Sequence, residues 1–234
     1  MRLFAFPHAG GGAAETFGLR RALAPAVELV PVALPGRDAL FREPPLTSHA
    51  GALAYLRGTL FDALEPPFAL YGHSMGAHVA FEVARELRRV GRPGPVRLCV
   101  SAAPAPQFGP PRPYAHLPDD RFVERLRTLG GTPDEVLADP GLLAFVLPRL
   151  RGDFALSESY RYADEPPLDC PISVWGGRAD AYSVERLRAW GEQTRAGFAL
   201  RMLDGGHFFV RDNEAAMAAA LRADLAAAPQ QVAA

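Results

Sequence analysis

The stretch Phe68-Ala69-Leu70-Tyr71-Gly72-His73-Ser74-Met75-Gly76 decides the fold of this chain. Its first four residues form an apolar run of strand length, and an amphipathic helical pattern begins directly after Ser74. Apolar side chains recur on one face of that helix at Met75, Val79, Val83, Leu87 and Val90. Glycine on both sides of the serine permits a sharp, strained turn and a close helix, because glycine has no Cβ atom. The G-x-S-x-G pattern therefore predicts a strand–turn–helix unit that exposes Ser74 as a nucleophile.

Apolar runs of strand length alternate with helical patterns along most of the 234 residues. This alternation is typical of a mostly parallel sheet flanked by helices, so we expect an α/β fold in a single domain. Strands are predicted at Leu3–Phe6, Glu28–Ala33, Phe68–Tyr71, Val96–Ser101, Ile172–Trp175 and Ala199–Leu203. Helices are predicted at Ala14–Leu23, Ser48–Ala63, Met75–Val90, Val184–Thr194 and Asn213–Ala227.

A segment of about residues 107–162 interrupts the alternation. It is rich in proline at Pro110-Pro111-Arg112-Pro113, and it contains helical patterns at Asp119–Leu129, Thr132–Ala138 and Gly141–Leu150 but no credible strand. An insertion of this size after a sheet strand is typical of a lid over a site at the strand ends. We therefore expect residues 1–234 to form one domain, with a core of residues 1–106 and 163–234 and a helical lid. A peripheral surface insertion is the alternative.

A serine hydroxyl needs a base, and the base needs an acid that orients it. In the α/β-hydrolase fold these residues follow the nucleophile in the order Ser, Asp or Glu, His. His207 is the predicted base, because Gly205-Gly206-His207 lies between the last predicted strand and the last helix, on a loop that can return to Ser74. His73 is expected to point away from the nucleophile, and His8 belongs to a separate motif. Packing or surface roles are expected for His49, His78 and His116.

Asp180 is the predicted acid of the triad. It follows the strand Ile172–Trp175 through Gly176-Gly177-Arg178-Ala179, at the carboxyl end of a strand, where ligand sites gather in such sheets. Asp153, inside the predicted lid, and Asp204, three residues before the base, are rivals, but neither follows a penultimate strand. Asp180 is expected to hold the imidazole in one tautomer and to stabilise the imidazolium that forms.

The glycine-rich run Pro7-His8-Ala9-Gly10-Gly11-Gly12 follows the first predicted strand. It lacks both the Gly-Lys-Ser/Thr ending of a phosphate-binding loop and the G-x-G-x-x-G spacing of a dinucleotide site. We interpret it as half of an oxyanion hole, with the backbone N–H of Ala9 as the expected donor and Gly10 as the alternative. The other donor is expected to be the Met75 N–H at the start of the helix after the nucleophile.

The formal net charge is −1, with 25 basic and 26 acidic residues, and no run of arginines is present. Nucleic acid and anionic membranes are therefore not expected as partners. Every basic side chain other than histidine is arginine, which excludes Schiff-base and P-loop lysine chemistry.

Cys99 and Cys170 sit in apolar surroundings and are expected to be buried free thiols. The apolar stretch of Met1–Pro7 is too short for a signal peptide and no window reaches membrane-spanning length, so a cytoplasmic protein is expected.

Taken together, these residues make the sequence similar to the type II thioesterases that accompany modular polyketide synthases and nonribosomal peptide synthetases, within the α/β-hydrolase superfamily. The resemblance covers nearly the whole chain. The stretches that carry it are Phe6-Pro7-His8-Ala9-Gly10-Gly11, Leu34-Pro35-Gly36-Arg37, Gly72-His73-Ser74-Met75-Gly76-Ala77, Leu129-Gly130-Gly131-Thr132-Pro133, Leu150-Arg151-Gly152-Asp153-Phe154, Pro171-Ile172 through Gly177, and Gly206-His207-Phe208-Phe209.

The resemblance implies a proofreading thioesterase that hydrolyses aberrant or stalled acyl groups from phosphopantetheinyl carrier proteins. It implies no cofactor, a carrier-protein partner and no requirement for more than a monomer. By position it places the nucleophile at Ser74, the acid at Asp180, the base at His207 and the oxyanion donors at Met75 and Ala9. Two alternatives stay open: a general serine esterase or lipase acting on small acyl esters, because the triad chemistry is the same, and a catalytically silent carrier-binding module.

Overall fold

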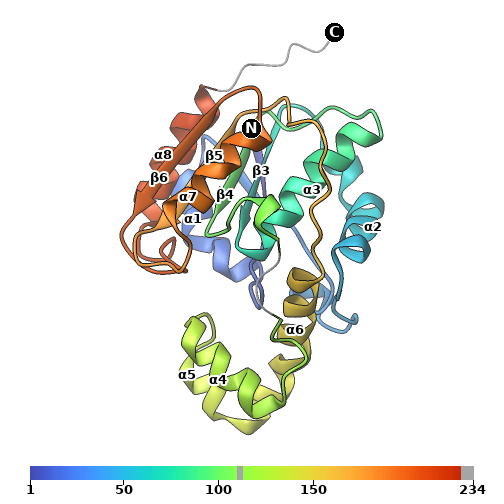
Figure 1. Ribbon diagram of the computed structural model, residues 1–234, viewed down its shortest axis with the longest axis vertical. Helices are drawn as coiled ribbons and strands as arrows, with labels where there is room; N and C mark the ends of the chain where they lie inside the picture. The colour runs from blue at the N-terminus through green and yellow to red at the C-terminus, as the bar shows by residue number, and fades with distance from the viewer. Residues whose placement is uncertain (110–112, 228–234) are drawn as a thin grey trace.

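The centre of the protein is a sheet of six parallel strands in the order β2-β1-β3-β4-β5-β6 (Figure 1). The structure is a computed structural model, and it describes residues 1–109 and 113–227. The strands are β1 (Arg2–Phe6), β2 (Glu28–Pro31), β3 (Phe68–His73), β4 (Leu98–Ser101), β5 (Ile172–Gly177) and β6 (Phe198–Leu203). Each predicted strand is present, so the predicted parallel sheet is confirmed.

Strands β1 and β3 are neighbours, with Phe6 opposite Gly72, but the chain leaves them in opposite directions along the sheet. From β1 it passes to β2 on one side, and from β3 it passes to β4 on the other. In open parallel sheets such a reversal leaves a crevice outside the carboxyl ends of the strands, where ligands bind. The residues that follow β1 and β3 therefore lie next to each other at this crevice.

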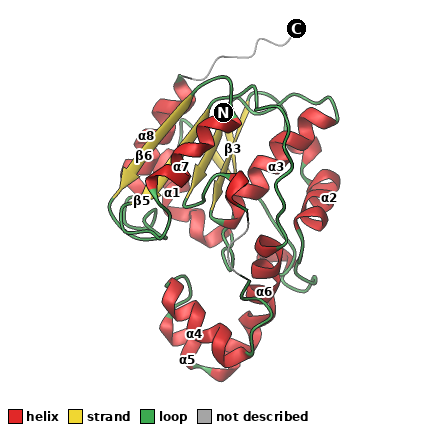
Figure 2. Ribbon diagram, in the orientation of Figure 1, coloured by secondary structure: helices red, strands yellow, loops and turns green. Residues whose placement is uncertain are grey.

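Helices cover both faces of the sheet (Figure 2). One face holds α2 (His49–Thr59), α3 (Met75–Arg89) and α7 (Val184–Arg188), and the other holds α1 (Phe17–Leu23) and α8 (Glu214–Ala226). Their apolar side chains form two cores, one against each face. Most of α3 is buried, because the predicted apolar stripe lies against the central strands. This packing fixes the position of the turn that precedes α3.

Three helices between β4 and β5 lie together, away from the sheet, at the bottom of Figure 1. They are α4 (Asp119–Leu129), α5 (Asp134–Ala138) and α6 (Pro140–Glu158), and they share a small apolar core that includes Phe122, Leu126, Leu137 and Leu150. The predicted end of α6 at Leu150 is wrong, since the helix continues to Glu158. Gly152 does not end the helix; it lets α6 approach Pro45, whose side chain a Cβ atom at position 152 would overlap. Pro110, Pro111 and Arg112 of the proline-rich stretch lie outside the described residues.

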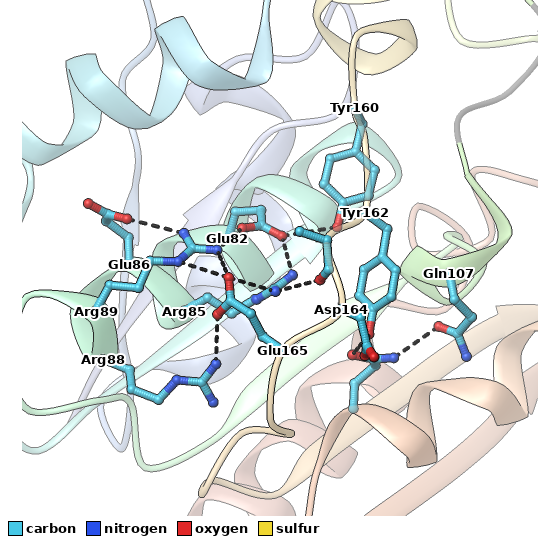
Figure 3. Close-up of polar contacts among 12 residues, drawn as sticks. Glu82, Arg85, Glu86, Arg88, Arg89, Gln107, Tyr160, Tyr162, Asp164 and Glu165 are labelled. Carbon is cyan, nitrogen blue, oxygen red and sulfur yellow. Dashed lines mark hydrogen bonds and ion pairs between the residues drawn. The ribbon is translucent and has the colours of Figure 1, made fainter.

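Residues 159–167, the return segment, lead from α6 back to the sheet and run along α3 (Figure 3). Three guanidinium groups of α3 bind the Glu165 carboxylate, from Arg85 at 2.9 Å, Arg88 at 3.0 Å and Arg89 at 2.6 Å. Burial would raise the pKa of Glu165, but these guanidinium groups lower it to about 2, so the carboxylate stays ionised. The return segment is thereby fixed to the helix that begins directly after Ser74.

Other boundaries differ from the predicted ones by a few residues. Strand β2 ends at Pro31 and not at Ala33, although the Val32 N–H still donates to the Ala5 carbonyl of β1 at 2.9 Å. Three of the predicted helices consist of an α-helix and a 3₁₀ turn: Ala13–Thr16 precedes α1, Phe61–Ala63 follows α2, and Ala189–Gln193 follows α7. The 3₁₀ turn Ala189–Gln193 also places the side chain of Trp190 in the core, where its Nε1–H donates to the Ala103 carbonyl.

Both cysteines are buried free thiols, as predicted. Cys99 lies in β4, and Cys170 lies just before β5. Burial raises the pKa of both thiols, that of Cys170 to about 12. Neither is therefore a reactive thiolate at neutral pH. Among the helices of residues 1–109 and 113–227, none is both long and apolar enough to span a membrane.

Candidate active site

Ser74 occupies the sharp turn between β3 and α3, with φ of 54° and ψ of −117°. A positive φ is unfavourable for a residue with a Cβ atom, so the turn is held by its surroundings. The Ser74 N–H donates to the Ser101 carbonyl at 2.8 Å. A Cβ atom on Gly72 would overlap the Gly76 carbonyl, and one on Gly76 would overlap the Phe6 carbonyl. The two glycines are thus needed for the close approach of α3 to β1 and β3, as the motif predicts.

His207 lies on the loop between β6 and α8, and its Nε2 is 2.9 Å from Ser74 Oγ. Gly205, with φ of 118°, allows the loop to turn sharply after the strand. The neighbouring loop after β5 supports it, because the Ala179 N–H donates to the Gly205 carbonyl at 2.9 Å. A Cβ atom at Gly177 would overlap the Gly206 carbonyl, so these two loops also lie in close contact.

Asp180 follows β5 and lies beside the other ring nitrogen of His207. Its Oδ2 is 3.1 Å and its Oδ1 is 3.3 Å from Nδ1 of the imidazole. The Asp180 side chain is 4% exposed, and its Oδ1 also accepts the Ala181 N–H at 2.6 Å. A carboxylate at this place favours the proton on Nδ1, which leaves the Nε2 lone pair to accept the Ser74 hydroxyl. The structure thus brings together all three residues of the predicted triad.

The rival residues lie in other environments. Asp153 is fully buried, with its Oδ1 2.5 Å from Arg37 Nη2, and the exposed Asp204 pairs with Arg178 at 3.1 Å. The His73 ring centroid is 5.5 Å from that of His207, but its Nδ1 contacts Ser101 Oγ at 2.8 Å. His8 is also near, although its Nδ1 donates to the Ala9 carbonyl at 2.9 Å.

His49 and His78 lie against Tyr160, and burial lowers their pKa values to about 3 and about 4, respectively. Both are neutral packing residues at pH 7. His116 lies on the surface.

The backbone donors proposed for an oxyanion lie on both sides of Ser74. Met75 is the first residue of α3, so its N–H has no partner within the helix. Ala9 lines the same cavity as Ser74, and no described residue accepts a hydrogen bond from its N–H. The Gly10 N–H instead donates to Asp153 Oδ2 at 2.7 Å. The Gly10 N–H therefore already has an acceptor, which favours the Ala9 N–H over the Gly10 N–H as the oxyanion donor.

Ser74 and His207 open into a cavity of about 580 Å³. Its wall is formed by the loops after β1, β5 and β6, by the start of α3, and by side chains of α4 and α6. The apolar side chains that face it include Met75, Leu126, Leu129, Leu150, Phe154 and Phe208. A largely apolar cavity that also contains some polar groups is typical of small-molecule sites.

Three charged residues beside the site were not predicted to have a role there. Arg37 and Asp153 form a buried ion pair, and the Arg149 guanidinium donates to the Gly10 carbonyl at 2.8 Å. Arg37 and Asp153 belong to the stretches Leu34-Pro35-Gly36-Arg37 and Leu150-Arg151-Gly152-Asp153-Phe154, which carried the family resemblance but had no assigned chemistry. The available signal in the sequence was that these two stretches contain residues of opposite charge, Arg37 and Asp153. In the described part of the chain, no three side chains of His, Cys, Asp or Glu gather as a metal site would require.

Known proteins resemble the chain over nearly its whole length. A family model described as a thioesterase domain matches residues 1–225. Gramicidin S biosynthesis protein GrsT of Aneurinibacillus migulanus is 38% identical over 216 residues, which cover 92% of this chain and 84% of GrsT. Thioesterase PikA5 of Streptomyces venezuelae is 37% identical over 218 residues, which cover 91% of this chain and 76% of PikA5.

Solved structures agree with these sequence matches. RedJ, a thioesterase from the prodiginine biosynthetic pathway in Streptomyces coelicolor, superposes with a TM-score of 0.88 at 37% identity, covering 96% of this chain and 90% of RedJ. BorB, a type II thioesterase from the borrelidin biosynthetic cluster, superposes with a TM-score of 0.87 at 37% identity, covering 96% of this chain and 92% of BorB. The predicted α/β-hydrolase fold and the resemblance to type II thioesterases are confirmed. The chain belongs to the thioesterase domain family.

Proposed function

We propose that this chain is a serine thioesterase that removes aberrant or stalled acyl groups from the phosphopantetheinyl arm of carrier proteins in a polyketide or nonribosomal peptide assembly line. The observation that carries the proposal is the 2.9 Å distance between Ser74 Oγ and His207 Nε2, both of which line a largely apolar cavity. Membership in the thioesterase family supports a thioester as the bond that is cleaved. The named pathways of RedJ, BorB and GrsT support the assembly line as the setting.

In the first half of the reaction, Ser74 Oγ attacks the thioester carbonyl carbon while His207 Nε2 takes the hydroxyl proton. The carbonyl oxygen becomes an oxyanion, and the N–H groups of Met75 and Ala9 donate hydrogen bonds to it. The carbon–sulfur bond then breaks, and His207 gives the proton to the departing sulfur. The products of this half are the free thiol of the arm and an acyl ester on Ser74.

In the second half, water takes the place of the arm. His207 Nε2 removes a proton from the water, and the resulting oxygen nucleophile attacks the acyl ester carbonyl. The same N–H groups stabilise the second oxyanion, and His207 returns the proton to Ser74 Oγ as the carboxylic acid leaves. Asp180 accepts the Nδ1–H bond in both halves and stabilises the imidazolium. Side chains, backbone groups and water are sufficient for every step of this scheme.

The segment of residues 107–162 acts in this proposal as a lid that forms the acyl chamber. Leu126 and Leu129 of α4 and Phe154 of α6 line the cavity that contains Ser74, so an acyl chain on the serine would contact them. The cavity of about 580 Å³ is within the range of about 300–1,000 Å³ that is usual for small-molecule sites.

The test is steady-state hydrolysis of a panel of acyl-carrier proteins and acyl-pantetheine thioesters, each compared with the oxygen ester of the same acyl group. We expect higher kcat/KM values for the thioesters and the highest for the carrier-bound forms. Equal or faster turnover of the oxygen esters would support a general esterase and contradict the proposal. Ser74→Ala should abolish turnover while circular dichroism shows an unchanged fold.

Labelling with a fluorophosphonate, followed by peptide mass spectrometry, separates an enzyme from a silent carrier-binding module. The wild-type protein should carry the adduct on Ser74, because the phosphorus centre reacts with an activated serine oxygen. The Ser74→Ala variant should carry none. An unlabelled wild-type protein that still binds acyl-carrier protein would favour the silent module.

A further inference from the structure

The turn Ala9–Gly11, in the loop after β1, has almost all of its backbone polar groups fixed by hydrogen bonds. In the turn Ala9–Gly11, the Ala9 carbonyl accepts from His8 Nδ1 at 2.9 Å, and the Gly11 N–H donates to the His8 carbonyl at 2.9 Å. Gly10 and Gly11 are bound by side chains from elsewhere, as described below. Of the six N–H and C=O groups of this turn, only the Ala9 N–H has no partner among the described residues. Within this turn the Ala9 N–H is thus the one donor left free, and Ala9 lines the same cavity as Ser74.

Three charged side chains supply the remaining bonds to the turn. Asp153 accepts the Gly10 N–H at 2.7 Å, and Arg149 donates to the Gly10 carbonyl at 2.8 Å. Arg37 donates to the Gly11 carbonyl at 2.8 Å, while its other amino group binds Asp153 at 2.5 Å. The side chains of Arg37 and Asp153 are 1% and 0% exposed, respectively. This ion pair is buried, so water does not replace a bond that it loses, whereas Arg149 is partly exposed.

We propose that Asp153, Arg149 and Arg37 are positioning residues, which orient the loop so that the Ala9 N–H can stabilise the oxyanion formed at Ser74. The inference rests on the proposed function, because it assigns residues that act through the oxyanion hole of that reaction. Two of the three residues come from α6, in the segment proposed as the lid. The lid helix thus holds a part of the catalytic machinery as well as a wall of the chamber.

The conformation of Gly10 explains why the loop needs external support. Its φ of 78° lies in the left-handed region, which glycine enters freely but also leaves freely. The peptide units on both sides of Gly10 can therefore rotate unless they are bound. Asp153 fixes the unit that contains the Gly10 N–H, and Arg149 fixes the unit that contains its carbonyl. The Ala9 carbonyl belongs to the first of these units, so a shift of that unit would displace Ala9 and move its N–H away from the oxyanion.

The proposal is tested with Asp153→Asn. The amide preserves the shape of the side chain, but it has one acceptor oxygen where the carboxylate serves both Arg37 and Gly10. On an acyl-pantetheine thioester we expect kcat to fall about 100-fold, the magnitude typical for the loss of one oxyanion donor, with KM within threefold of wild type. Affinity for an alkyl trifluoromethyl ketone should fall by a similar factor, because the ketone forms an oxyanion on addition of Ser74. The apparent pKa in the kcat/KM profile should not move, since the triad is untouched.

Asp224→Asn is the matched control. Asp224 is buried and forms a bidentate pair with the partly exposed Arg201 at 2.7 and 2.8 Å, between β6 and α8 and outside the cavity lining. It should change kcat, KM and ketone affinity by less than threefold. A folded Asp153→Asn variant with wild-type kcat, or one that loses kcat without losing ketone affinity, overturns the proposal. An equal loss in Asp224→Asn also overturns it, because the effect would then be a general loss of packing.

If Asp153→Asn does not fold, Arg149→Met decides the matter. It removes one bond to the loop without leaving a buried carboxylate alone, and it should lower kcat and ketone affinity about tenfold. Arg92→Met is its control, because Arg92 donates to the Phe61 carbonyl at 2.9 Å, away from the cavity. A wild-type kcat in Arg149→Met overturns the proposal.

The rate of fluorophosphonate labelling of Ser74 should fall in parallel with kcat. If the wild-type protein hydrolyses no thioester, the proposed function is overturned. The labelling rate of Ser74 would still test the proposed role of Asp153, Arg149 and Arg37, because labelling does not require thioester hydrolysis.

Discussion

Lowering the pH from 7.5 to 5.0 should destabilise this protein strongly, because its fold buries neutral histidines. His78 lies between the rings of Tyr160 and Trp190, and its Nε2–H donates to the Pro104 carbonyl at 2.9 Å. Burial lowers the pKa of His78 to about 4. His49 lies against the same tyrosine ring, and burial, together with the charge that His78 would carry, lowers its pKa to about 3.

The sign and size of the effect follow from proton binding. In the unfolded chain both histidines have a pKa near 6.5, so below that pH the unfolded state binds protons that the folded state excludes. The free energy of unfolding is then largest above pH 6.5 and falls as the pH drops towards the folded pKa values. Each group contributes about 1.4 kcal/mol per pH unit in this window. At pH 5.0 the loss is roughly 2 kcal/mol for each histidine, or about 4 kcal/mol for the pair.

Urea denaturation at several pH values between 7.5 and 5.0 measures this loss, with the fluorescence of the buried Trp175 and Trp190 as the signal. His78→Gln removes one titrating group and keeps a donor for the Pro104 carbonyl, so the slope with pH should decrease by about 1.4 kcal/mol per unit. His116→Gln, at an exposed position, should keep the wild-type slope. A constant free energy of unfolding, or an unchanged slope in His78→Gln, would refute the reasoning.

Three further substitutions test the elbow, the triad and the helical segment. Asp180→Asn should lower kcat about 10⁴-fold in thioester hydrolysis without changing the thermal midpoint by more than a few degrees, because the imidazole loses its orienting carboxylate; activity within tenfold of wild type would contradict its role. Gly76→Ala should give no soluble native protein, or a protein without activity, since the new methyl group would overlap the backbone of β1; an active, stable variant would exclude this close approach. Phe122→Ala should cost about 3–5 kcal/mol in urea denaturation, because this fully buried ring fills the core of α4–α6 and contacts Phe154 edge to face; a loss under 1 kcal/mol would mean that this core is loosely packed.

Local patterns were sufficient to predict the elements that lie against the sheet. The apolar stripe of α3 and the strand before Ser74 could be read from side-chain spacing, because both bury one continuous face. The end of α6 could not be predicted in this way. Glycine at position 152 is locally a helix breaker, and only the contact with Pro45, distant in sequence, makes it suitable for the helix interior.

The arrangement of Ser74, Asp180 and His207 could be predicted because the fold constrains both chain order and place. A serine at an elbow, an aspartate after a later strand and a histidine before the last helix must meet at the carboxyl edge of the sheet. The buried pair of Arg37 and Asp153 has no such rule, since the two residues are 116 positions apart and belong to different elements. The proposed role of the pair depends on hydrogen bonds from side chains to the backbone of a loop. Such bonds produce no periodic pattern in the sequence.

The separate apolar core of α4–α6 has a consequence for how such a chain diversifies. Phe122, Leu126 and Leu137 belong to none of the clusters that hold the helices to the sheet, so substitutions there leave the packing of the sheet intact. Leu126 also lines the cavity, so substitutions that accumulate in the core of α4–α6 change the shape of the cavity. Mutations in the two parts should therefore be close to additive, and selection for a new acyl group can act on one part alone. Arg149 and Asp153 are the exceptions: a lineage can reshape the chamber around them, but we expect it to keep both.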